Sequence, residues 1–97
     1  MALTPEGFVK TRVKKLLDEA KCYHYWPVGN GMGSPTLDCL GCHHGRFFSI
    51  ETKAPGKKPT PRQEGTIREM TAAQGMTFVI DGTDGSYDLL KMWLGIV

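Results

Sequence analysis

The sequence predicts an α/β fold in which helices flank a mixed central β-sheet, and residues 1–97 are predicted to form a single domain of this class. Two patterns lead to this prediction. Apolar residues recur at helical spacing near the N-terminus, whereas polarity alternates around Phe48, as it does along a strand. Segments that contain Pro and Gly separate these runs, so the predicted order of elements is α-β-β-β-α-β-α.

Three segments are predicted to be helices, each with a Thr or Ser that can cap its start. They run from about Pro5 to Ala20, from Thr60-Pro61 to roughly Ala73, and from Ser86 through Trp93. Glu6 is placed on the apolar face of the first helix, three residues before Val9. It also lies near the helix N-terminus, where the helix dipole favours an anion.

Four segments are predicted to be strands, because they are rich in aromatic and β-branched residues or alternate in polarity. They are Cys22 to Val28, Thr36 to Leu40, Arg46 to Lys53 and Met76 to Ile80. Residues 29–35 are predicted to be a flexible Gly-rich loop, and residues 54–59 a basic loop. The tight connection at residues 41–45 predicts a hairpin between the second and third strands.

The composition is that of an ordinary globular protein, with 40% hydrophobic and 23% charged residues. The net charge is only +2 at pH 7, so any nucleic-acid surface must arise from where Lys and Arg are placed. No apolar run approaches the roughly 20 residues that span a bilayer, and the first residues lack the apolar region of a signal peptide. We therefore expect a cytoplasmic protein with no membrane partner and with reduced thiols.

A candidate metal site lies on the third predicted strand. Glu51 and Lys53 are two residues apart, so their side chains emerge on one sheet face, and Asp38 lies within reach on the preceding strand. The two carboxylates repel each other unless a cation lies between them, and Mg²⁺ or Mn²⁺ would relieve the repulsion. The backbone carbonyl of Thr52 is placed to join them, and Lys53 could orient or deprotonate an attacking water. The alternative is a plain surface ion pair between Glu51 and Lys53.

Several of these residues together resemble a known nuclease group. They are Glu6, the run SPTLD that ends at Asp38, the run GRFFSIETK that ends at Lys53, and the run TPRQ that ends at Gln63. The pattern resembles the PD-(D/E)xK nuclease superfamily, and most of all its stand-alone VRR-NUC branch, over most of the chain. The resemblance implies a restriction-endonuclease-like core and a metal-dependent DNA endonuclease. It further implies that Asp38 and Glu51 bind the metal, that Lys53 is the catalytic lysine, and that Glu6 contacts a metal-bound water.

The same resemblance implies a substrate and an assembly. Stand-alone members of the branch are similar to Holliday junction resolvases and work as dimers, so we expect a homodimer that acts on four-way junctions. A compact nuclease of this kind suits a phage genome and the host cytoplasm. A non-catalytic module that binds nucleic acid is the alternative function. Gln63 matches the glutamine that follows the lysine in this branch, but Thr60 and Gln63 also form a capping-box pattern.

Basic residues follow the candidate site directly. Lys57, Lys58 and Arg62, together with Lys53 and Arg46, are predicted to form a basic edge that holds DNA phosphates. The alternative is that this segment is an ordinary solvated loop.

A second cluster could bind a different metal. Cys39, Cys42 and His43 match the haem-attachment pattern CxxCH, but that pattern requires export, so we expect no haem. With His44 the same residues could bind zinc. The alternative is that Cys39 packs as a small apolar side chain while the two histidines lie in a solvated turn.

The C-terminal segment SYDLLKMWLGIV carries apolar side chains on more than one helix face. We expect the surplus to form an exposed patch that a twofold homodimer would bury. The alternative is a monomer whose last helix packs fully into its own core.

Overall fold

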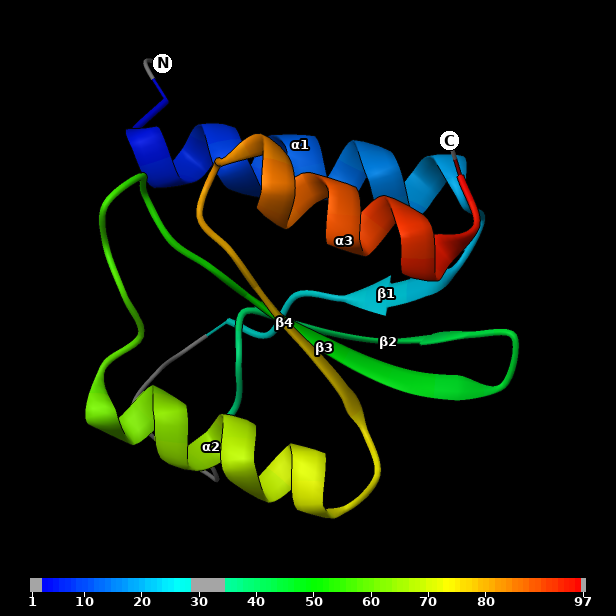
Figure 1. The fold of residues 1–97 in the computed structure, drawn as a ribbon. Helices are drawn as coiled ribbons and strands as arrows, with labels where there is room; N and C mark the ends of the chain where they lie inside the picture. Colours follow the sequence, from blue (N-terminus) through cyan, green and yellow to red (C-terminus); the bar gives the residue numbers. More distant parts are fainter. Residues whose placement is uncertain (1–2, 29–34, 97) are drawn as a thin grey trace.

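The computed structural model describes residues 3–28 and 35–96, and the predicted order of elements is confirmed (Figure 1). The elements are α1 (Pro5–Glu19), β1 (Tyr23–Tyr25), β2 (Cys39–His43), β3 (Arg46–Thr52), α2 (Pro61–Ala72), β4 (Met76–Ile80) and α3 (Asp84–Leu94). Most of the predicted Gly-rich loop, residues 29–34, lies outside the described residues. Among the described residues, no helix is both long and apolar enough to span a bilayer.

The four strands form one mixed sheet in the order β1-β2-β3-β4. The pairs β1–β2 and β2–β3 are antiparallel, whereas β3–β4 is parallel and is connected through α2. Helices α1 and α3 cover one face of the sheet, and α2 lies on the opposite side (Figure 1). The predicted mixed sheet flanked by helices is therefore confirmed.

The hydrophobic core lies between the sheet and the layer of α1 and α3. Its buried residues are Val9, Val13, Leu16, Leu17, Cys39, Phe48, Ile50, Phe78, Ile80, Tyr87, Leu90 and Leu94. Helix α2 contributes only Thr66 to the buried residues. The sheet face under α2 is thus sealed by fewer apolar groups, and polar side chains such as Ser49 and Glu51 can occupy it.

The predicted boundaries of the second strand were wrong. β2 begins at Cys39 and runs to His43, so Gly41 is a strand residue paired with Phe48. A Cβ at Gly41 would clash with the backbone carbonyl oxygen of Tyr23 and with the Phe48 ring, which explains why glycine stands inside a strand here. The connection is only His44 and Gly45, whose φ angles of 51° and 79° suit a two-residue hairpin turn.

Two other predicted boundaries differ from the structure. β1 ends at Tyr25, because Pro27 has no N–H to extend the ladder and Trp26 donates its indole N–H to His24 at 2.9 Å. Helix α3 begins at Asp84, capped by Thr83, and not at Ser86. Ser86 is instead the residue whose backbone N–H donates to the Thr83 hydroxyl.

Candidate active site

Glu51 is a buried carboxyl near the end of β3, on the sheet face covered by α2. Only 3% of the residue is exposed. Its Oε2 accepts a hydrogen bond from Gln63 Nε2 at 2.9 Å and lies 3.6 Å from Lys53 Nζ. Burial raises the pKa of Glu51 to about 7; the nearby charge of Asp38 also raises it, and Lys53 lowers it. A second positive charge beside Glu51 would therefore stabilise the ionised form of this carboxyl.

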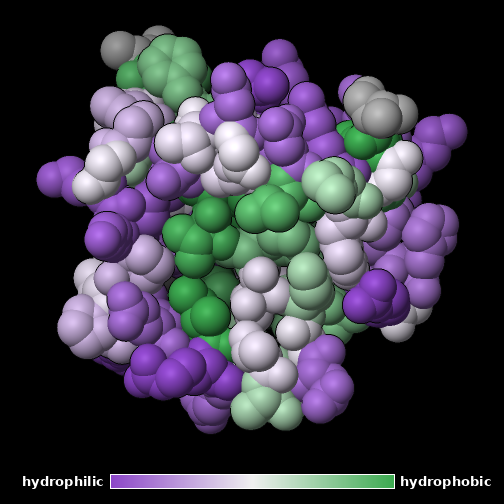
Figure 2. Space-filling view, in the orientation of Figure 1, coloured by the Kyte–Doolittle hydropathy of each residue, from purple (hydrophilic) through white to green (hydrophobic). Residues whose placement is uncertain are grey.

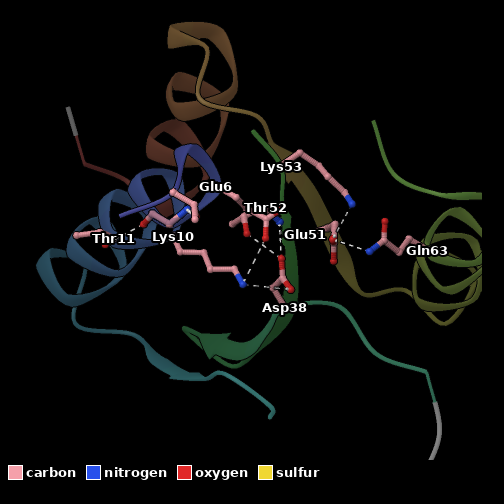
Figure 3. Close-up of polar contacts among 10 residues, drawn as sticks. Glu6, Lys10, Thr11, Asp38, Glu51, Thr52, Lys53 and Gln63 are labelled. Atoms are coloured by element: carbon pink, nitrogen blue, oxygen red, sulfur yellow. Dashed lines mark hydrogen bonds and ion pairs between the residues drawn. The ribbon is translucent and has the colours of Figure 1, made fainter. Parts of the chain in front are cut away.

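Asp38 lies immediately before β2, at the end of the ladder that pairs Cys39 with Ile50. Its Oδ2 accepts hydrogen bonds from the backbone N–H of Thr52 at 2.9 Å and from the Thr52 hydroxyl at 2.7 Å. The carboxylate thus turns toward Thr52 and α1, and does not lie flat over the face that carries Glu51, as the strand prediction had placed it. The two donors fix Oδ2, while Oδ1 lies 3.9 Å from the Lys10 ammonium of α1 (Figure 3).

The backbone carbonyl of Thr52 is directed to the side of β3 on which Asp38 lies. In a strand, the N–H and C=O of one residue point toward the same neighbour. Since the Thr52 N–H donates to Asp38, the Thr52 carbonyl is directed to the same side of β3. The next residue turns the other way, because the Lys53 N–H donates to the Ile80 carbonyl of β4 at 2.9 Å. The structure therefore places these residues around one end of β3, with Asp38 on the side of Thr52 and α1 and with Glu51 and Lys53 on the side of α2.

The side chain of Gln63 contacts both the cap of α2 and the candidate site. Its Oε1 accepts from the Thr60 N–H at 2.9 Å, and its backbone N–H donates to the Thr60 hydroxyl, which completes the capping box of α2. Its Nε2 donates to Glu51 (Figure 3). One amide thus links the start of α2 to the buried carboxyl.

Glu6 was predicted to lie on the apolar face of the first helix, and this prediction is wrong. Its side chain is 41% exposed and its Oε2 lies 3.5 Å from Lys10 Nζ. The core contacts of α1 begin only at Val9, one turn further along. The Lys10 ammonium also lies 3.9 Å from Asp38 Oδ1, so it stands between the two carboxylates (Figure 3). The spacing of four residues between Glu6 and Lys10 places the two side chains on one face of α1.

The predicted basic edge is only partly assembled. Lys57 and Lys58 are exposed in the loop after β3, and Arg62 is exposed in the first turn of α2. Arg46 lies at the opposite end of β3, where its guanidinium carbon is 5.4 Å from the centre of the Trp93 ring. A strand of this length separates Arg46 from Lys53 by about 20 Å, so the structure does not place Arg46 in this edge.

The Cys/His cluster is spread over different environments. Cys39 is buried in the core, Cys42 is exposed, and His44 lies in the hairpin turn. His43 is buried and its Nε2 is 3.0 Å from the carbonyl oxygen of Leu94. Within residues 3–28 and 35–96, no three His, Cys, Asp or Glu side chains are grouped so that they could hold a metal ion.

Comparisons with known proteins support the fold. No protein-family model matches the chain, and no curated protein matches it. A solved structure described as "VRR_NUC domain" superposes with a TM-score of 0.78 and 21% sequence identity, over 93% of this chain and 98% of that one. The fold that the sequence resemblance implied is therefore confirmed.

Proposed function

We propose that this chain, which has the fold of a VRR_NUC domain, is a metal-dependent endonuclease that hydrolyses phosphodiester bonds in DNA. The observation that carries the proposal is the meeting of Asp38, Glu51 and Lys53 at one end of β3. Two carboxylates and an ammonium are costly to gather in a half-buried place unless a ligand offsets their charge.

The residues present fit a hard divalent ion. The two Thr52 donors contact Oδ2 of Asp38, Gln63 and Lys53 contact Oε2 of Glu51, and the Thr52 carbonyl is directed to the side of Asp38. Oxygen ligands of this kind suit Mg²⁺ or Mn²⁺, which keep several waters when protein ligands are few. When bound, such an ion would supply an acidified water and offset charge on the phosphate.

The protein's own groups would set the geometry of the reaction. The two Thr52 donors hold Asp38 in one orientation, and Gln63 does the same for Glu51. Lys53 directly follows β3, and its ammonium, paired with Glu51, is placed to orient the attacking water. Glu6 stands beyond Asp38 and would act on the site through hydrogen bonds and not as a ligand.

Contacts with the DNA substrate are proposed for exposed basic residues in the segment between β3 and α2 and in the first turn of α2. Lys57, Lys58 and Arg62 follow β3 and precede or open α2, where their exposed charges could hold phosphates on either side of the cut. Because each contact of this type neutralises a phosphate, binding would depend on salt and only weakly on base sequence.

We also propose a homodimer and, through it, four-way-junction substrates. The apolar surplus expected on α3 is present, since Leu89 is 64% and Met92 76% exposed. Figure 2 shows a further apolar area at the centre of the face where Figure 1 places β4, whose Val79 is also exposed. A twofold assembly that buries the α3 residues would present two sites symmetrically, as paired cuts in opposed strands require.

The test is a cleavage panel on duplex, flap, single-stranded and four-way-junction DNA, with Mg²⁺, Mn²⁺ or a chelator. Cleavage only with the divalent ion, lost in Lys53→Met, is the expected result. DNA binding without cleavage under every condition would favour the non-catalytic module. Equal cleavage of all substrates would leave the nuclease proposal standing but would remove the junction preference.

A further inference from the structure

Lys10 is the cation that the sequence pattern of the site does not include. It projects from α1 into the space beside Asp38, while Lys53 approaches Glu51 from the opposite side (Figure 3). Its Nζ lies 3.5 Å from Glu6 Oε2 and 3.9 Å from Asp38 Oδ1. Both distances are within ion-pair range, and Lys53 lies beside Glu51, so each carboxylate of the site has an ammonium next to it.

The Lys10 contact uses the oxygen of Asp38 that is otherwise free. Oδ2 is occupied by the Thr52 backbone and hydroxyl donors, whereas Oδ1 faces Lys10. Oδ1 is therefore also the oxygen available to a divalent ion. A divalent ion placed against it would bring like charges close together, because the Lys10 ammonium already stands there.

We propose that Lys10 is a tethered counter-cation of Asp38, which competes with the divalent ion for this carboxylate and must swing away when the ion binds. The inference rests on the metal site proposed above. The Lys10 side chain is suited to this movement, because it is 36% exposed and its flexible stem is anchored on a helix at the edge of the site. Glu6, four residues earlier on the same helix, offers the ammonium a partner that does not require Asp38.

Metal titration by calorimetry tests the proposal without measuring cleavage. Mn²⁺ would be titrated into the full chain as wild type, Lys10→Met and Lys15→Met. Lys15 is the matched control, since it is exposed on the same helix and its removal changes the net charge equally. We expect Lys10→Met to bind Mn²⁺ about two- to fivefold more tightly than wild type, the range for a partly exposed ion pair. Lys15→Met should bind like wild type.

A thermal-shift experiment gives a second readout on the same three proteins. Without metal, Lys10→Met should melt below Lys15→Met, because Asp38 and Glu6 lose their counter-cation. Saturating Mn²⁺ should then raise the melting temperature of Lys10→Met by more than that of the other two.

The outcomes separate this inference from the proposed function. If wild type and Lys15→Met bind Mn²⁺, Asp38→Asn does not, and Lys10→Met binds no more tightly than wild type, the competition proposal is wrong and the metal site stands. Weaker binding by Lys10→Met would overturn it in the same way, by showing that Lys10 supports the ligand geometry. If no variant binds Mn²⁺, the metal site fails and the role of Lys10 fails with it.

Discussion

Gln63 Nε2 donates a hydrogen bond of 2.9 Å to Glu51 Oε2, while the other end of the same amide caps α2. The orientation of the buried carboxyl is thus coupled to the start of a helix whose first turn also carries Arg62. An amide can accept from the Thr60 N–H and donate to Glu51 at the same time, whereas a carboxylate at this position could only accept.

The two functions of Gln63 can be separated by a neighbouring substitution. Thr60→Ala removes the capping hydroxyl but leaves the bond between Gln63 and Glu51. Gln63→Ala removes the bond to Glu51 and the side-chain half of the capping box, in which Gln63 Oε1 accepts from the Thr60 N–H. Each variant should lose about 0.5–2 kcal/mol of stability, as for other helix caps. Only Gln63→Ala should also slow cleavage, by about 10–100-fold, the scale of groups that orient metal ligands. Denaturant unfolding and initial cleavage rates measure the two effects. Equal cleavage by the two variants would reduce Gln63 to a cap.

The catalytic assignment predicts that Asp38→Ala, Glu51→Gln and Lys53→Met each abolish detectable turnover. The physical reason is that two would lose a charged metal ligand and the third the ammonium that orients the attacking water. Thr52→Val is the graded control, because it removes the hydroxyl donor to Asp38 and keeps the backbone donor. Its rate should fall only partially. Circular dichroism must show that each variant is folded, and a folded Lys53→Met that cuts at the wild-type rate would contradict the assignment.

Stability of the metal-free protein should depend on pH through Glu51. The pKa of this carboxyl is raised from 4.5 to about 7, so the folded chain binds its proton more tightly than the unfolded chain. The contribution of protonated Glu51 to the free energy of unfolding is therefore fully present below about pH 4.5 and is lost as the pH rises through about 7. Urea unfolding in a chelator, between pH 4.5 and 8, should show this decline in wild type. Glu51→Gln, which cannot titrate, should lack that part of the decline, and identical pH profiles would show that Glu51 is not the group responsible.

The basic loop is predicted to bind phosphates, with Arg46 as its control. Joint replacement of Lys57, Lys58 and Arg62 by alanine should weaken DNA binding similarly for all sequences. The slope of log affinity against log salt should fall by about one unit for each lost contact. Arg46→Ala should leave the slope unchanged, because Arg46 lies at the far end of β3 over Trp93. Binding measured by fluorescence anisotropy at several salt concentrations decides this. A change in slope for Arg46→Ala alone would move the DNA surface to the other end of the sheet.

The dimer is predicted to depend on the exposed residues of α3. Light scattering at micromolar concentration should give about twice the chain mass of 10.7 kDa for wild type. Leu89→Lys combined with Met92→Lys should give the monomer mass with little loss of stability, since both side chains are exposed. Trp93→Ala should instead destabilise the fold, because its ring packs against Phe48 and Phe78. A monomeric wild type would remove the support for paired cuts in a junction.

Local patterns in the chain were sufficient for the order of elements and for the centre of the site. The alternation along β3, continued to Lys53 directly after it, predicts that Glu51 and Lys53 emerge on one side, because the side-chain period of a strand is two residues. The caps at Thr4 and Thr60 are equally local, since each involves donors within three residues. Predictions that rested on glycine as a turn signal failed at Gly41, where a distant ring explains the residue.

Contacts between separate elements were decided only by the tertiary structure. The register of β2 against β3 turns Asp38 toward the donors of Thr52, and the packing of α1 on the sheet brings Lys10 to the same carboxylate. The length of β3 likewise removes Arg46 from the basic loop. Periodicity along one element specifies which way a side chain points. Which groups it meets depends on register, helix position and burial, and these follow from how all the apolar faces pack into one core.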